Sequence, residues 1–360
     1  MSIEQALELQ SRAWALQAEG KLEDAFSACL EALQLTEQNK GANSPDAANL
    51  LNDLAEIECD RQKFQEALTC AERALAIEKT QVHLFAGETA TRIRLKTLAL
   101  LGELRRVQGD YASAESDLQE GVRLAAGEFG EASDEYAQTL NDLAVVHKYC
   151  GRFDEGFRLY EEALRITIAA QGEECLTAST IYHNMGGILF SKGDFVAAEP
   201  FGEKAWKISQ RLVGESDPRT MADAAAYAAI LDGLRRYDES EAIYRRAVAA
   251  FEKSLGPIHC EVAATLHNLA AVLVAKGNYR EAEEHYRRAL AIKESLLGVD
   301  SPEVALTRTN LGSLLNVLGR YTESVPLLKN AVAVLEGRLT SAHPQLGLAR
   351  ESLRKALSLS

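Results

Sequence analysis

A single turn position recurs through the chain at an almost constant interval. It is occupied in turn by Gly20, Gln62, Gly109, Gly151, Gly193, Arg235, Gly277 and Gly319. Successive copies lie 42 residues apart, except for one step of 47 residues. A fixed period of about 20–50 residues is typical of stacked supersecondary units. Because 360 residues would also make an unusually large single core, the sequence predicts a repeat array.

The residues around each turn repeat as well. Seven positions before the turn, every copy has a small residue: Ala13, Ala55, Gly102, Ala144, Gly186, Ala228, Ala270 and Gly312. Twelve positions after it, every copy again has Ala or Gly, and two positions after it seven of the eight copies have Phe or Tyr. Small residues at fixed helical positions let two backbones approach closely. Each unit is therefore predicted to be a helix, a tight turn and a second helix.

The segments between the units carry helix-start signals. A capping residue followed by proline occurs at Ser44–Asp46, Asp217–Arg219 and Ser301–Glu303. Leu, Ala and Glu are abundant, whereas the chain has only 7 prolines, so we expect an all-α protein.

These columns resemble the tetratricopeptide repeat, in the 42-residue form found in kinesin light chains. The resemblance implies a right-handed α-solenoid of about eight helix–turn–helix repeats that forms one domain over residues 1–360. A capping helix over residues 344–358 would cover the last exposed face. The expected repeats are 3–43, 45–88, 90–132, 134–174, 176–216, 218–258, 260–300 and 302–342.

Two departures from the repeat are expected to have local consequences. The 47-residue step places five extra residues near Lys79–Thr91, which predicts a longer linker or an extended helix there. The second turn has Gln62 where most copies have glycine.

Composition restricts the kind of partner. The formal net charge of −14 argues against nucleic-acid binding, because phosphate contacts need a basic surface. The start of the chain lacks the features of a secretory signal, and no apolar run reaches the roughly 18 residues of a spanning helix, so no membrane partner is expected. Six cysteines without a Cys-x-x-Cys pair are typical of free thiols in a reducing compartment, which predicts a cytoplasmic protein.

We find no catalytic or metal-binding motif in the sequence, and we expect neither enzymatic activity nor a cofactor. His183 and His267 occupy the same repeat position two units apart. With helix axes about 8–10 Å apart, their side chains would lie roughly 16–20 Å apart and could not share a metal ion.

The resemblance places a peptide-binding groove on the inner face of each first helix, at positions 13, 10, 9, 6 and 2 before the turn. Amide and imidazole groups recur at positions 10 and 9, and an amide can pair with the main chain of an extended peptide. Alternatively, these side chains bond a neighbouring helix. The candidate groove residues are Asn52, Asp53, Asn141, Asp142, His183, Asn184, Gly187, Ala225, Ala226, Ala229, His267, Asn268 and Asn310.

The expected groove is not uniform. In repeats 2 to 4 it carries more carboxylates than cations, which favours a basic partner segment. In repeats 5 and 6 it is lined by Gly187, Ala225, Ala226, Ala229 and Gly233. These small residues either form a shallow apolar pocket, flanked by His183/Asn184 and His267/Asn268, or only tighten the local curvature.

The sequence therefore predicts a non-catalytic scaffold or adaptor that holds a peptide or helical segment of another protein. The alternative is a structural protein that associates with itself through the ends of the solenoid, for example as a homodimer.

Overall fold

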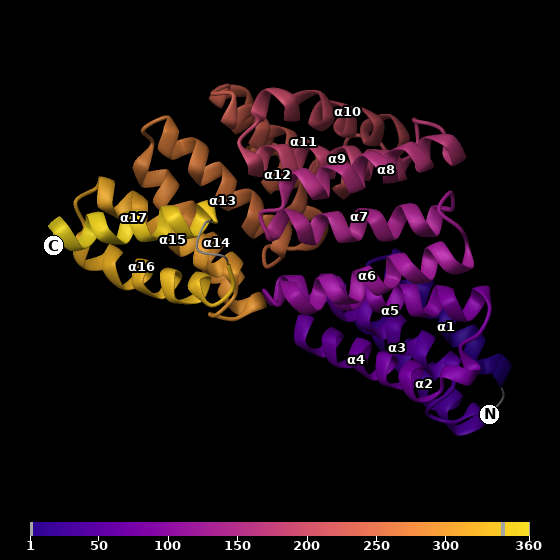
Figure 1. The fold of residues 1–360 in the computed structure, drawn as a ribbon. Coiled ribbons are helices and arrows are strands. Elements are labelled where there is room, and N and C mark those ends of the chain that lie inside the picture. Colours follow the sequence, from indigo (N-terminus) through magenta and orange to yellow (C-terminus); the bar gives the residue numbers. More distant parts are fainter. Residues whose placement is uncertain (1–2, 340–342, 360) are drawn as a thin grey trace. The chain divides into compact units, whose positions relative to one another are not determined.

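The computed structural model describes residues 3–339 and 343–359, and the described residues form 17 α-helices, one short 3₁₀ helix and no strand. Figure 1 shows the helices as successive antiparallel neighbours. The all-α prediction is confirmed. The first sixteen helices pair as α1 Ile3–Ala18 with α2 Leu22–Lys40, α3 Pro45–Asp60 with α4 Phe64–Thr80, α5 Glu88–Val107 with α6 Tyr111–Glu128, α7 Asp134–Tyr149 with α8 Phe153–Gln171, α9 Leu176–Lys192 with α10 Phe195–Val213, α11 Pro218–Gly233 with α12 Tyr237–Leu255, α13 Cys260–Ala275 with α14 Tyr279–Leu297, and α15 Pro302–Val317 with α16 Tyr321–Glu336.

The small residues of the repeat allow the paired helices to pack closely. Ala13, Ala55 and Ala144 have no exposed surface. A Cβ atom added at Gly312 would lie 2.7 Å from Cγ of Leu328 on the partner helix, so only glycine fits there. The repeating columns therefore mark the helix–helix contacts of each pair.

The turns end the first helix of each pair in the left-handed conformation. Gly193, for example, has φ 86° and donates its backbone N–H to the last turn of α9. Gln62 and Arg235 occupy the same position with φ 61° and 63°, a conformation in which a side chain is strained.

The five extra residues of the 47-residue step are shared between a linker and a helix. The linker contains the 3₁₀ helix η1 (Val82–Leu84) and buries Phe85. The following helix, α5, has 20 residues, against 16 in α3. Both consequences expected from the sequence are therefore present.

The chain divides into two compact units. Unit 1 comprises residues 1–106 and 112–143, and unit 2 comprises residues 107–111 and 144–360. The boundary lies within α7. That the whole chain forms a single domain stays a prediction.

The end of the chain forms one more helix, α17, which spans Pro344–Leu359. It packs on α15 and α16 and buries Leu346 and Ala349. The last three residues of the expected eighth repeat, 340–342, lie outside the described residues. Among the residues that are described, no helix is long and apolar enough to cross a membrane.

Candidate protein-binding surface

The residues at position 10 before the turn connect successive first helices. Asn52 of α3 donates from Nδ2 to Oγ1 of Thr97 on α5 (2.8 Å). In unit 2, Nδ1 of His183 on α9 lies 2.8 Å from Oδ1 of Asp223 on α11. All these partners stand 12 positions before their own turn, and polar residues at that position are a sequence signal that the prediction overlooked.

His267 on α13 follows the same rule two helix pairs further along. Its Nδ1 lies 3.0 Å from Oγ1 of Thr307 on α15, and its Nε2 lies 3.0 Å from Nδ2 of Asn310. Burial, together with the nearby Lys293 cation, lowers the pKa of His267 to about 3. His267 is therefore a neutral imidazole that joins two helices.

The residues at position 9 before the turn also contact neighbouring helices. Asn268 hydrogen-bonds the hydroxyl of Tyr244, and Asn310 hydrogen-bonds the hydroxyl of Tyr286 on the preceding second helix. Asn184 is half-buried at the equivalent place on α9. These bonds agree with the alternative interpretation, in which the polar rows hold the helices together. Contact between these side chains and a partner's main chain stays a prediction.

In unit 1 the charged groups of the inner face are paired with one another. Lys96 Nζ donates to Asp53 Oδ1 (2.7 Å) and lies 2.8 Å from Glu56 Oε2. Asp53 also accepts a hydrogen bond from Gln10 Nε2 (2.6 Å), and it is only 1% exposed. Arg106 pairs with Glu103 in the same unit (2.6 Å).

Asp142, the last predicted groove residue of unit 1, has polar partners as well. Its Oδ1 accepts hydrogen bonds from Gln138 (2.8 Å) and from Asn141 (3.2 Å). Burial nevertheless raises the pKa of Asp142 to about 6, with a smaller contribution from Glu103. These carboxylates of the predicted acidic surface therefore have partners within the chain, and a preference for a basic segment stays a prediction.

In unit 2 the inner face is lined by small residues, and some of them serve packing. Ala225 and Ala229 on α11 pack against the core formed with α13. A Cβ atom at Gly233 would lie 2.3 Å from the ring of Phe195, so this glycine lets the two helices meet. These contacts agree with the alternative in which the small residues of repeats 5 and 6 only tighten the local curvature.

Two small positions in the same stretch remain open. Ala226 is half-buried on α11. A Cβ atom at Gly187 on α9 would meet only Nζ of Lys148, at 3.7 Å, which is an ordinary contact with the end of a flexible side chain. Gly187 is thus a position of the small-residue stretch that no core side chain closes, and a pocket there stays a prediction.

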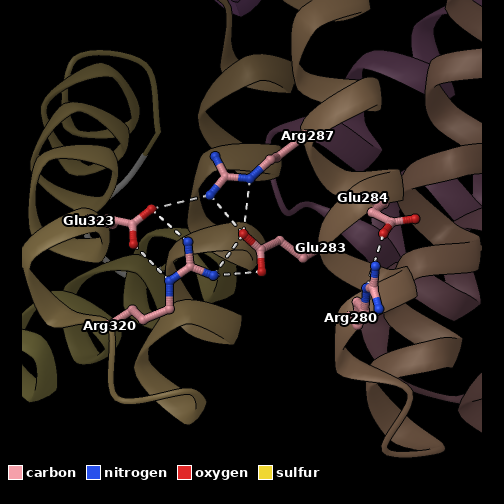
Figure 2. A network of polar contacts seen from close by, with 6 residues as sticks. All are labelled: Arg280, Glu283, Glu284, Arg287, Arg320 and Glu323. Atoms are coloured by element: carbon pink, nitrogen blue, oxygen red, sulfur yellow. Dashed lines mark hydrogen bonds and ion pairs between the residues drawn. The ribbon is translucent and has the colours of Figure 1, made fainter.

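The second helices carry a different kind of surface. Figure 2 shows Glu283 on α14 bound by both Arg287 and Arg320, with Glu323 of α16 completing the network. Arg320 Nη1 lies 2.7 Å from Glu283 Oε2, and Arg280 forms a separate, looser pair with Glu284 (3.6 Å). Exposed pairs of this kind contribute about 0–1 kcal/mol each, and they leave these charges already matched.

The described residues hold no group of three or more His, Cys, Asp or Glu side chains that could bind a metal ion. His183 and His267 each bond a separate partner on the first helix of the next repeat.

The architecture, paired antiparallel helices with repeating small residues at their contacts, defines an α-helical repeat protein. The tetratricopeptide repeat family matches residues 4–79, 94–169, 140–211, 177–253, 220–295 and 261–337. The chain belongs to this family.

Among curated proteins, the chain is similar to Protein KINESIN LIGHT CHAIN-RELATED 3 of Arabidopsis thaliana, with 22% identity over 240 residues. That match covers 66% of this chain and 36% of the relative. Protein KINESIN LIGHT CHAIN-RELATED 1 of the same plant is 25% identical over 229 residues, which cover 62% of this chain and 36% of the relative. The chain thus spans about a third of the length of these relatives.

Two solved structures share the fold along most of the chain. One is a Rap protein complexed with Competence and Sporulation Factor, with a TM-score of 0.62, 15% identity and coverage of 99% of this chain and 100% of that one. The other is the apo form of the quorum sensor NprR from B. thuringiensis, with a TM-score of 0.60, 14% identity and coverage of 92% and 87%. At these identities the likeness establishes the fold alone.

Proposed function

We propose that this protein is a non-catalytic scaffold or adaptor that holds a segment of another protein on the inner face of its first helices. The observation that carries the proposal is the open small-residue surface of unit 2, at Gly187 and Ala226. An extended backbone could approach the helices there without displacing a core side chain. Nearby side-chain amides are already held in place by bonds to neighbouring helices. They would offer hydrogen-bonding groups to the bound segment with little further loss of side-chain entropy.

Membership of the family and the likeness to the Rap structure are consistent with this proposal. The family that matches the chain is a repeat family and not a family of enzymes. The Rap protein was solved in a complex with Competence and Sporulation Factor, so the shared fold can accommodate a bound factor.

The proposed location is the cytoplasm, on the basis of the thiols. None of the six cysteines forms a disulfide, and burial raises the pKa of Cys59 to about 12. Such thiols stay protonated near neutral pH and fit a reducing compartment.

Selection from a random peptide display library on the folded chain tests the proposal. We expect recovered peptides to bind the wild-type chain and to lose binding with Ala226→Arg, because the arginine would fill the open surface. Ala249→Arg is the matched control, since Ala249 is exposed on the second helix of the same repeat. Equal loss in both variants, or retained binding with Ala226→Arg while thermal unfolding is unchanged, would exclude the inner face of unit 2.

Self-association is a second candidate, favoured by one observation. Ile3, Leu7 and Trp14 are 43%, 55% and 48% exposed along one face of α1. Light scattering over a range of concentrations distinguishes the two functions: a mass that doubles with concentration in the wild type, and not in Leu7→Glu, supports the second.

A further inference from the structure

Helix α11 of unit 2 carries a carboxylate that differs from the other carboxylates discussed above. Asp53, Asp142 and Asp223 each accept a hydrogen bond from a neighbouring side chain. Asp232, near the end of α11, has no hydrogen bond or ion pair through its side chain within the described residues.

The surroundings of Asp232 make an unpaired carboxylate costly. Its side chain is half-buried, three positions before the turn, and burial alone raises its pKa to about 6. The Asp232 carboxylate interacts electrostatically with the hydroxyls of Tyr244 and Tyr286. Both hydroxyls are neutral and are hydrogen-bonded to the amides of Asn268 and Asn310. A cation supplied from outside would stabilise this carboxylate where the chain itself provides none.

A second inner-face charge lacks a counter-ion in the same unit. Lys148, at the end of α7, makes no ion pair within the part of the chain that the structure describes. Its Nζ lies 5.0 Å from the ring centre of Tyr149 and 3.7 Å from the place that a Cβ atom would take at Gly187. The ammonium group of Lys148 therefore rests over the glycine of α9, the helix next to α11.

The two charges are too far apart to pair with each other. Neighbouring helix axes lie about 8–10 Å apart, and Asp232 is a few residues further along its helix than Gly187 is along α9, so the ammonium and the carboxylate are separated by roughly 10 Å. An extended chain covers that distance in about three residues. Side chains on one face of an extended chain recur every second residue, so charged residues two or four positions apart (i, i+2 or i, i+4) match the site.

We propose that unit 2 binds an extended partner segment carrying one basic side chain, for Asp232, and one acidic side chain, for Lys148, two or four residues apart. This inference rests on the proposed function and specifies the chemistry of its ligand. The open floor at Gly187 and Ala226 lies along the same two helices and leaves room for the backbone of the segment. The order of the two charges then fixes the direction in which the segment lies.

The test is a peptide display selection run in parallel on the wild-type chain, Asp232→Asn, Lys148→Gln and the charge-swapped pair Asp232→Lys/Lys148→Glu. Wild-type selection is expected to enrich peptides with a basic and an acidic residue at the stated spacing. Asp232→Asn should lose the enrichment of the basic residue, and Lys148→Gln that of the acidic residue. The swapped pair should enrich the same spacing with the charges reversed. Each single variant is expected to weaken a wild-type-selected peptide roughly tenfold.

The outcomes separate this inference from the proposed function. Peptides that bind without a charge pair, or with one at another spacing, overturn the inference and leave the scaffold function standing. Failure to recover any peptide from any of the four chains overturns both. Because Asp232→Asn removes an uncompensated charge, its thermal stability should equal or exceed that of the wild type, so a loss of binding cannot be ascribed to unfolding.

Discussion

The inner faces of the two units use their charges in opposite ways. In unit 1, Lys96 lies between Asp53 and Glu56, and a third contact from Gln10 completes the surroundings of Asp53. In unit 2, Lys148 and Asp232 have no charged partner among the described residues, and the ammonium group of Lys148 approaches Gly187. The charges of unit 1 therefore contribute to its own stability, whereas the unpaired charges of Lys148 and Asp232 are the ones that we propose a partner would match.

The comparison shows why a count of charges along the sequence is a weak guide to binding. A carboxylate that already bonds a cation of its own chain gains less from a second cation, because its charge is largely compensated and some of its acceptor positions are occupied. A half-buried carboxylate without a cation is already partly desolvated in the free protein, so less hydration is lost when a partner's cation covers it.

Lys96→Met should produce the largest effect, because it removes the cation from a carboxylate that is 1% exposed. Breaking a buried pair from one side costs about 3–5 kcal/mol. We expect the free energy of unfolding of unit 1, measured by hydrogen exchange in α3 and α5, to fall by that amount. The double variant Lys96→Met/Asp53→Asn should recover most of the loss. A fall below about 1 kcal/mol would mean that the charges of unit 1 are not coupled.

The pH dependence of stability should have opposite signs in the two units. Burial raises the pKa of Glu78 in unit 1 to about 7, so its contribution is greatest below pH 4.5 and is lost as the pH rises through 7. The folded pKa of His267 in unit 2 is about 3, so its contribution is complete above pH 6.5 and is lost as the pH falls.

Two substitutions isolate these effects. Glu78→Gln should stabilise α4 and α5 at pH 8 by up to about 3 kcal/mol, with little change at pH 4. His267→Gln should remove a loss of about 2 kcal/mol that the wild type shows in α13 and α15 between pH 7 and pH 5, although Lys293 and Glu303 also act on this site. Hydrogen exchange of the named helices, corrected for the intrinsic rate, measures both. The same sign in both units would contradict the assignment.

The repeat period and its small-residue columns were sufficient to predict the helix pairs, because close packing of two helices admits only Ala, Gly or Ser at fixed positions. The polar rows could not be assigned in the same way. Asn52 and Asn268 share a repeat motif, and only the structure distinguishes a bond to a neighbouring helix from a surface open to a ligand. Whether a charge is paired depends on residues about 40 positions away, as with Asp53 and Lys96. For the same reason Asp232 was missed.

Introducing glycine at the two turns that lack it should change the free energy of unfolding less than the substitutions above, and by similar amounts in the two units. Gln62 and Arg235 hold positive φ angles, which cost roughly 1–2 kcal/mol for a residue with a side chain. Gln62→Gly and Arg235→Gly should each raise the free energy of unfolding by about 0.5–1 kcal/mol, after allowance for the greater entropy of unfolded glycine. The gain should be larger for Arg235, because Gln62 Nε2 donates to the carbonyl of Cys59 (3.1 Å) and loses that bond. Chemical denaturation of each variant measures the difference.

Lys148→Met should have the smallest effect on stability, and it is the matched counterpart of Lys96→Met. Methionine keeps the apolar stem of the lysine, so the substitution removes only the charge. Since the ammonium group has no carboxylate and only a contact with the ring of Tyr149, the free energy of unfolding should change by about 0.5 kcal/mol or less. Hydrogen exchange in α7 and α9 gives the value. A loss approaching that of Lys96→Met would show that Lys148 has a counter-ion within the chain. It would then contradict the proposed difference between the paired charges of unit 1 and the unpaired charges of unit 2.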